Sequence, residues 1–247
     1  MTMAFPDHFS AVAEKYAAYR PHYPPALAEA LAALTTPGVA WDIGCGNGQL
    51  AVLLGAQFAR VIATDPSAKQ IAAAVAHPRV EYRVEPAEAS TLGDASVDLA
   101  VAAQAAHWFE WPRFLAEVGR VTKPGGLVAL VSYGKMMLDA DAGAELRHYY
   151  RDVAGPHWPP ERAHVENGYR DLTLPWPAVA APPLDMTADW TRDELVGYVS
   201  TWSATARLVE RDGSTPFDTF VSRIQAVWPG NEKRLVRWPL TLRLARR

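Results

Sequence analysis

A run of alternating glycines constrains this chain more than any other feature. Residues 39–43 form a short apolar segment that contains one carboxylate, Asp42. The next residues of note are three alternating glycines and three leucines at helical spacing: Gly44, Gly46, Gly48, Leu50, Leu53 and Leu54. The pattern predicts a strand, a tight turn and a helix, because glycine adopts positive φ angles at little steric cost. The first N–H groups of such a helix have no partner within the helix, so the stretch predicts a nucleotide-sized binding site.

The spacing of the glycines limits which ligand the turn can hold. A dinucleotide fingerprint needs Gly-x-Gly-x-x-Gly, which seats a pyrophosphate on the helix N-terminus. Here the third glycine, Gly48, comes one residue early, and Gln49 occupies the dinucleotide position. A P-loop is excluded because no Gly-Lys-Ser/Thr follows and no lysine lies near the turn. A different nucleotide-like ligand, or a tight turn with incidental glycines, remains.

Length and charge set the broad class of the protein. The 247 residues suffice for one sizeable α/β domain with an elaboration, and a net charge of −3 with a pI near 6.2 disfavours a nucleic-acid partner. Cys45 is the only cysteine, so no intramolecular disulfide can form. We see no signal peptide, no apolar run of about 18 residues that could span a membrane, and no cluster of metal ligands. We therefore expect a cytoplasmic protein with a small-molecule partner, no membrane and no metal, and a monomer by default.

Apolar segments alternate with segments of helical periodicity along the first half of the chain. We expect strands over 39–43, 60–64, 80–84, 98–103 and 127–132, helices over 25–34, 68–76 and 111–121, and further helices over 139–153, 193–207 and 217–227. Strand–helix alternation is typical of a doubly wound α/β fold with a parallel sheet. Residues 236–244 then alternate with period two and predict a last strand, which contains Pro239.

Polar residues follow several of these strands at the edge where ligands of open α/β sheets bind. Asp65 ends the second strand, where a carboxylate can accept hydrogen bonds from ribose hydroxyls. An Asx turn in front of a helix capped by Ser67 is the alternative interpretation, and both can hold together. The fourth strand runs into Gln104 and the pair His107-Trp108, a second candidate site on the same edge.

These motifs together resemble a known superfamily. Gly-x-Gly-x-Gly after an acidic residue, the pairs Asp65-Pro66 and His107-Trp108, and the turn 123–126 resemble the class I S-adenosylmethionine-dependent methyltransferases. Residues 19–24, 104–108 and 202–203 look like the trans-aconitate-methyltransferase-related, type 11-like branch. The resemblance implies a Rossmann-like, mostly parallel seven-stranded sheet whose antiparallel last strand lies inside it, so Pro239 would require a bulge or frayed pairing. It divides a single domain into N-terminal helices (1–35), a cofactor-binding core (36–135), a substrate-covering segment (136–230) and a final strand (231–247).

The resemblance also implies a cofactor, S-adenosyl-L-methionine, with S-adenosyl-L-homocysteine as the product. Pro86 stands where an acidic residue often binds the adenine amino group, so that contact would fall to the backbone of Ala87 and to Glu88. The cofactor-binding residues that it implies are Tyr16, Asp42, Gly44, Cys45, Gly46, Gly48, Asp65, Pro66, Ala87, Glu88 and Gln104.

Methyl transfer to a small molecule by in-line displacement is the activity implied, and the branch resemblance suggests a carboxylic acid as acceptor. His107 is the candidate base for an acceptor that must lose a proton; a structural histidine beside Trp108 is the alternative. Arg20 could clamp an acceptor carboxylate or bind the cofactor's own carboxylate. Tyr19, Trp108 and Trp202 complete the candidate substrate residues, although Trp202 on a helix could equally be core.

Two other functions stay open at this point. A catalytically silent protein could bind S-adenosylmethionine and methylate nothing, since the glycine turn survives loss of activity. A nicotinamide-dependent oxidoreductase could use the same fold, and Gln49 in place of the third dinucleotide glycine disfavours it.

Overall fold

The computed structural model describes residues 21–247, which divide into two compact units. One, the sheet unit, consists of residues 22–135, 161–186 and 238–247. The other, the helical unit, consists in its described part of Pro21, 136–160 and 187–237. One boundary lies at residue 135, and the single domain with a cofactor-binding core over 36–135 stays a prediction.

The sheet unit contains the expected α/β alternation. Its helices are α2 (Pro25–Ala33), α3 (Gln49–Gln57), α4 (Ala68–Ala72), α5 (Trp111–Val121) and α7 (Arg162–Glu166), with a 3₁₀ turn η2 (Ala106–Trp108). Its strands are β1 (Val39–Ile43), β2 (Arg60–Asp65), β3 (Val80–Val84), β4 (Val97–Ala103), β5 (Thr122–Tyr133) and β6 (Ala178–Val179). β7 (Asp185–Trp190) and β8 (Arg234–Arg246) run from one unit into the other.

The strand order confirms a mostly parallel, doubly wound sheet. The order is β3-β2-β1-β4-β5-β8-β6, and the strands from β3 to β5 pair in parallel. β7 also pairs with β8, so the sheet has eight strands, one more than expected. The direction of winding reverses between β1 and β4, and ligands of open α/β sheets bind beyond the carboxyl ends of the strands at such a point. The topology thus places the glycine turn at the expected edge.

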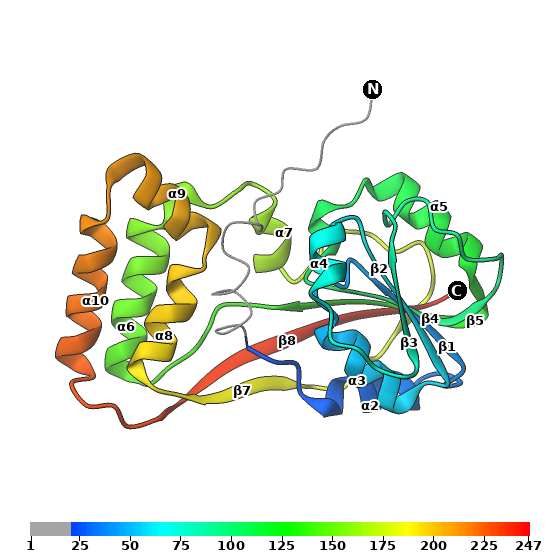
Figure 1. Cartoon of the computed structure of the whole chain (residues 1–247), viewed down its shortest axis with the longest axis horizontal. Coiled ribbons are helices and arrows are strands. Elements are labelled where there is room, and N and C mark those ends of the chain that lie inside the picture. The colour runs from blue at the N-terminus through cyan, green and yellow to red at the C-terminus, as the bar shows by residue number, and fades with distance from the viewer. Residues whose placement is uncertain (1–20) are drawn as a thin grey trace. The chain divides into compact units, whose positions relative to one another are not determined.

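Helices cover both faces of this sheet, and the alternation of side chains decides which face each residue lines. Leu27 and Leu54, from α2 and α3, pack with Val61 and Val101 on one face. Phe114 of α5 packs with residues such as Trp41, Ile62 and Val128 on the other face. Figure 1 shows α5 above the sheet and α2 and α3 below it.

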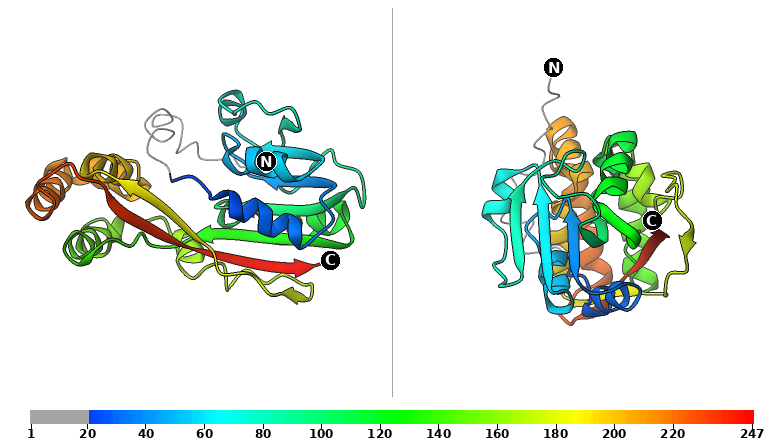
Figure 2. Two further views of the ribbon diagram at one scale, coloured as in Figure 1. Left: turned by 90° about the horizontal axis from the view of Figure 1, so that it is seen from below. Right: turned by 90° about the vertical axis from the view of Figure 1, so that its right-hand side faces the viewer.

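The last strand is antiparallel and lies inside the sheet, as the resemblance implies. β8 pairs with β5 on one side and β6 on the other, and the left view of Figure 2 shows β5 and β8 running in opposite directions. Regular pairing with β5 ends where Tyr133 faces Leu240, directly beside Pro239. The next bridge joins Met137 to Arg237, so four steps along one segment face three along the other. The expected irregularity therefore occurs at Pro239, which has no N–H to donate.

The helical unit is built mainly from four helices. They are α6 (Ala140–His148), α8 (Arg192–Ser200), α9 (Ser203–Asp212) and α10 (Thr215–Val227), joined by the short turns η3 (Tyr149–Val153) and η4 (Gly155–His157). α8 begins with a capping box in which Thr191 and Glu194 satisfy each other's backbone N–H groups. Buried aromatic side chains, among them Tyr149, Phe220 and Trp228, form much of its core.

Two helix predictions were wrong in extent. The helix expected over 193–207 is two helices, because the hydroxyls of Ser200 and Thr201 donate to the carbonyls of residues 197 and 198 and end α8. The helix expected over 68–76 ends at Ala72, and no residue of this helix is buried, so no packing extends it. The helix expected over 25–34 is confirmed as α2, while residues 1–20 of the expected N-terminal helices (1–35) lie outside the described residues.

Candidate functional site

The glycine turn between β1 and α3 uses the left-handed backbone angles that its sequence predicts. Gly44, Gly46 and Gly48 have φ values of 67°, 55° and 86°. A Cβ atom on Gly44 would lie 2.6 Å from Cβ of Ala105, and one on Gly48 would meet the Tyr82 ring and hydroxyl. We call residues 44–48 the glycine corner. Gly44 and Gly48 are thus required both by backbone angle and by close packing, against the turn after β4 and against β3.

Asp65 is joined directly to the glycine corner. Its Oδ2 accepts a hydrogen bond from the Gly46 N–H at 2.9 Å, and its Oδ1 accepts one from the Ser67 N–H at 2.9 Å. Ser67 also caps α4 through its side chain, so the expected Asx turn is present, and the expected ribose contact of Asp65 stays a prediction. Burial raises the pKa of Asp65, while the hydrogen bonds from Ser67 and Gly46 oppose that rise. A carboxylate held against the corner in this way can still accept hydroxyl donors on its free lone pairs.

Asp42 provides a test of whether the cofactor fits this site. Its side chain is buried, and its Oδ2 has no hydrogen-bond partner. Burial and the nearby Asp65 carboxylate raise the pKa of Asp42 to about 7, although a hydrogen bond from the Ala51 backbone opposes this. An unpaired buried carboxylate oxygen is costly, and a cation removes that cost. The amino acid part of S-adenosylmethionine carries an ammonium group, so the residues present fit this cofactor.

Cys45 in the glycine corner and Pro66 in the turn after β2 add no charge to the site. The Cys45 Sγ lies 3.5 Å from the Gly46 carbonyl, and burial, followed by Asp42 and Asp65, raises the pKa of its thiol. The thiol therefore stays protonated at neutral pH and is not a nucleophile here. Pro66 follows Asp65 directly and leads into the cap of α4.

The loop after β3 carries the residues expected at the adenine. Ala87 is buried in the core cluster on the α5 side of the sheet. The Glu88 carboxylate accepts a hydrogen bond from the Glu110 N–H at 2.9 Å, at the start of α5. Glu88 is therefore tied to α5, and the contact expected from it stays a prediction.

The turn after β4, residues 104–109, brings a second group of predicted residues together. Gln104 has a φ of 54° and donates through Nε2 to the Tyr133 carbonyl at 3.1 Å. His107 lies in η2, and its ring centroid lies 4.8 Å from that of Trp108. We call this segment the β4 turn. A non-glycine residue at positive φ is strained, and such strain clusters at functional sites.

His107 has a partner that the sequence analysis missed. Its Nδ1 lies 2.9 Å from the Tyr169 hydroxyl, and the two rings stack at 6.0 Å. Tyr169 is fully buried and has a φ of 58°, and Arg243 donates to its backbone carbonyl. This contact gives His107 a structural partner, while the base role stays a prediction. Only the neighbouring Gly168 signals a tight turn in the sequence, and nothing there links Tyr169 to His107.

The remaining candidates lie elsewhere. Tyr16, Tyr19 and Arg20 lie outside the described residues. Trp202 belongs to the helical unit, where it precedes α9 instead of lying within a helix. Its ring centroid lies 5.4 Å from Tyr150, 5.5 Å from Trp158 and 5.8 Å from Tyr198. An aromatic cluster therefore surrounds Trp202 in that unit.

Residues 21–247 lack two other kinds of feature. This part of the chain contains no group of three or more His, Cys, Asp or Glu side chains arranged to hold a metal ion. Over the same residues, every helix is too short or too polar to cross a lipid bilayer.

Sequence comparisons agree with the geometry of the corner. Residues 41–130 match the family model described as Methyltransferase domain. A protein of Dictyostelium discoideum named as a methyltransferase is 32% identical over 211 residues, which cover 83% of this chain and 80% of that protein. A Mycobacterium tuberculosis protein named as an uncharacterized methyltransferase is 35% identical over 124 residues, about half of each chain.

Structural comparisons extend the similarity to almost the whole chain. A solved structure described as a type II methyltransferase from Anaeromyxobacter dehalogenans is 43% identical, with a TM-score of 0.88 over 92% of this chain and 98% of that one. The YcgJ protein of Bacillus subtilis is 16% identical with a TM-score of 0.55 over 90% of this chain and 97% of that one, a likeness of fold alone.

Proposed function

We propose that this chain, which belongs to the class I S-adenosylmethionine-dependent methyltransferases of type 11, methylates a small-molecule acceptor. The observation that carries the proposal is the hydrogen bond from the Gly46 N–H to Asp65, because it joins the glycine corner to the carboxylate at the end of β2. When bound, the cofactor supplies an electrophilic methyl group on a sulfonium. The protein's part is to align and desolvate the reacting groups.

Each end of the cofactor has a proposed partner on the sheet unit. We assign the ribose hydroxyls to Asp65 and the ammonium to Asp42, whose Oδ2 has no other partner. The corner backbone lies between them, and the loop at Ala87 and Glu88 is assigned to the adenine. Cys45, Pro66 and Gln104 line the turns that carry these groups, and Tyr16 is proposed to cover the cofactor.

The acceptor decides whether a base is needed. A carboxylic acid is ionised at neutral pH and needs none, whereas a phenol or alcohol must lose a proton. For such acceptors we propose His107 as the proton acceptor, with Trp108 beside it. For a carboxylic acid we propose Arg20 as the clamp, since a guanidinium binds a carboxylate through two hydrogen bonds. Tyr19 and Trp202 are the remaining proposed acceptor contacts.

Two measurements test the proposal in sequence. Isothermal titration calorimetry with S-adenosylmethionine and S-adenosylhomocysteine should give one site for each, and NADH should not compete. A screen that detects S-adenosylhomocysteine release should then compare small carboxylic acids with phenols and amines. We expect turnover with carboxylic acids. Absence of cofactor binding, or binding without transfer to any acceptor, contradicts the function. Transfer to phenols or amines and not to carboxylic acids contradicts the proposed acceptor class.

A further inference from the structure

The loop between β3 and β4 is held in shape by hydrogen bonds that the proposed chemistry does not use. The Glu85 carboxylate accepts from the Thr91 N–H at 3.0 Å and from the Thr91 hydroxyl at 2.6 Å. Arg83, on β3, donates to the same hydroxyl at 2.9 Å. These bonds close residues 85–91 into a compact turn, which we call the β3 loop. Ala87 and Glu88, the residues assigned to the adenine, lie inside it.

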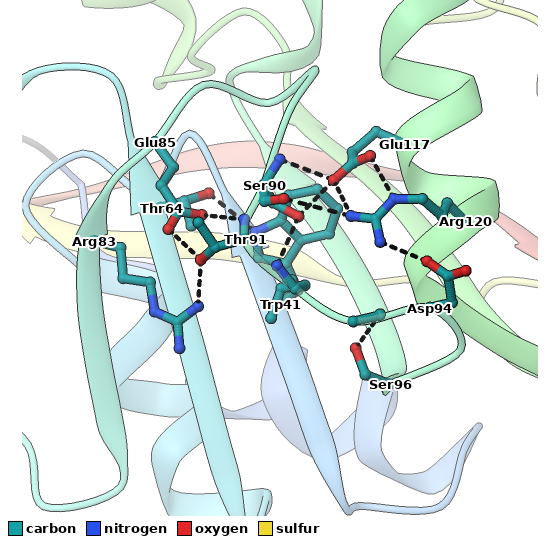
Figure 3. Close-up of polar contacts among 12 residues, drawn as sticks. Trp41, Thr64, Arg83, Glu85, Ser90, Thr91, Asp94, Ser96, Glu117 and Arg120 are labelled. Carbon is teal, nitrogen blue, oxygen red and sulfur yellow. Dashed lines mark hydrogen bonds and ion pairs between the residues drawn. The ribbon is translucent and has the colours of Figure 1, made fainter.

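A second set of bonds ties the β3 loop to α5. Oε1 of Glu117 accepts from the Ser90 N–H at 2.8 Å and from the Ser90 hydroxyl at 2.6 Å. Arg120 binds both oxygens of Glu117, at 2.6 and 2.9 Å, and also pairs with the exposed Asp94 at 2.7 Å. Figure 3 shows these side chains converging from α5 and from the loop.

Glu117 is placed to hold the loop and not merely to stabilise its own helix. It is buried, and a buried carboxylate is stable only when its oxygens are well bonded. Burial raises the pKa of Glu117, but the hydrogen bonds from Arg120 and Ser90 outweigh it and leave the pKa below its usual value. An ion pair confined to the helix would need only Arg120. Two of its bonds instead go to Ser90, two residues beyond Glu88.

The loop is thus anchored on both sides of the residues assigned to the adenine. Glu85 bonds to Thr91 across its base, Glu88 bonds to the start of α5 at the Glu110 N–H, and Ser90 bonds to Glu117 further along the same helix. Such anchoring lowers the conformational cost of binding, because fewer arrangements of the loop must be given up.

We propose that Glu117 is a positioning residue that, through Ser90, sets the β3 loop for the adenine of the cofactor. This inference rests on the proposed function, because it needs the β3 loop to contact the adenine. Glu117 touches neither the cofactor nor the acceptor in this scheme. Its effect is on cofactor affinity alone, through the fraction of molecules whose loop is arranged to bind.

The test measures S-adenosylhomocysteine affinity by calorimetry at a temperature well below every variant's Tm. Glu117→Gln places an amide opposite the Arg120 donors, and Ser90→Ala removes the loop hydroxyl. We expect Glu117→Gln to weaken binding about tenfold and Ser90→Ala about threefold, in line with the loss of charge-assisted hydrogen bonds. The double variant should lose less affinity than the product of the two effects, because both changes break one contact.

Two matched controls break an exposed ion pair without touching the Ser90 contact. Arg113→Gln breaks the exposed pair of Arg113 on α5 with Glu110, also spaced i to i+3, and Asp94→Asn breaks the exposed pair with Arg120. We expect both to leave affinity within about twofold of wild type, as exposed ion pairs contribute little.

Hydrogen exchange separates a local effect on the β3 loop from a general loss of stability. Amides of residues 85–91 should exchange faster in Glu117→Gln without ligand, while those of β1 and β4 should not change. If the wild-type protein binds S-adenosylhomocysteine and both Glu117→Gln and Ser90→Ala bind it with the same affinity, this inference is overturned and the proposed function stays intact. Failure of the wild-type protein to bind S-adenosylhomocysteine overturns both.

Discussion

The glycine corner and the β4 turn lie after neighbouring parallel strands, yet they reach left-handed backbone angles by different means. In the corner, glycines adopt the positive φ values, and two of them have no room for a Cβ atom. At the β4 turn, Gln104 adopts a φ of 54°, and Tyr169, which contacts this turn, adopts 58°. A side chain at such an angle costs about 1–3 kcal/mol.

The two turns differ in how the energetic cost of a positive φ is avoided or offset. Glycine has no side-chain strain to relieve, so a ligand can approach the backbone of the corner closely, and Oδ2 of Asp42 stays available to it. Gln104 and Tyr169 instead use their side chains to bond to Tyr133 and His107. The corner is therefore built for a ligand to approach its backbone, whereas the β4 turn is built to hold particular side chains in place.

Gly44→Ala should break the corner most severely. The new Cβ atom would have to share space with Ala105 at a positive φ, so we expect the free energy of unfolding to fall by about 2–4 kcal/mol and S-adenosylhomocysteine binding to be lost. Urea unfolding and calorimetry measure the two effects. Gly134→Ala is the matched control, because nothing lies within 4 Å of its Cβ position. Near-wild-type binding by Gly44→Ala would show that the corner does not need its glycine.

Asp65→Ala should come next in size. We expect affinity for S-adenosylmethionine to fall roughly 10- to 100-fold, as for loss of hydrogen bonds to a charged group. Ser67→Ala separates ligand binding from the capping of α4, since it removes the cap and keeps the Ser67 N–H that donates to Asp65. It should lower the free energy of unfolding by about 1 kcal/mol and leave affinity nearly unchanged. Unchanged affinity in Asp65→Ala would remove that residue from the site.

The raised pKa of Asp42 makes the corner sensitive to pH. Its pKa is about 7 in the folded chain, above the unfolded value near 4, so the folded state binds the extra proton between these values. Its contribution to the free energy of unfolding is therefore present at low pH and is lost as pH rises from about 4 to 7. Cofactor affinity should change in the opposite sense, rising by up to tenfold per unit below pH 7, because the ammonium requires the ionised carboxylate.

Asp42→Asn tests both pH effects. In this variant, urea unfolding and calorimetry across pH 5 to 8 should show neither the fall in the free energy of unfolding nor the rise in cofactor affinity that Asp42 causes. Equal pH profiles for cofactor binding in the variant and in wild type would contradict the pairing of Asp42 with the ammonium.

Tyr169→Phe tests how the β4 turn is supported. Removing the hydroxyl breaks the hydrogen bond between Tyr169 and Nδ1 of His107. We therefore expect the free energy of unfolding to fall by about 1–2 kcal/mol and the ¹⁵N chemical shifts of the His107 ring to change. Tyr82→Phe is the control, because that hydroxyl bonds to an exposed carbonyl. Unmoved His107 signals would show that Tyr169 does not determine the state of the ring.

Gln104→Gly should have the smallest effect. Relief of the positive φ offsets loss of the bond to the Tyr133 carbonyl, so the free energy of unfolding should change by less than about 1 kcal/mol. Urea unfolding measures this balance. A loss of more than about 2 kcal/mol would show that the side chain does far more for the turn than its backbone angle costs.

Much of the sheet unit could be predicted from local sequence. The strand bounds 39–43 and 80–84 and the helix 111–121 agree with the structure, because hydrophobic periodicity and Pro or Gly boundaries act over a few residues. The break of the 193–207 segment was missed because Ser200 and Thr201 suit a helix as well as its end, and their hydroxyl bonds decide between the two.

The sequence by itself determined the glycine corner and the position of Asp65, since glycine spacing and strand order act through backbone geometry. Only the tertiary structure decided that Tyr169 bonds to His107 and that Glu117 holds Ser90. The two residues of these pairs are 62 and 27 positions apart in the sequence, and no motif around one of them points to the other. Contacts between distant side chains depend on how strands and helices pack, and no local pattern encodes that packing.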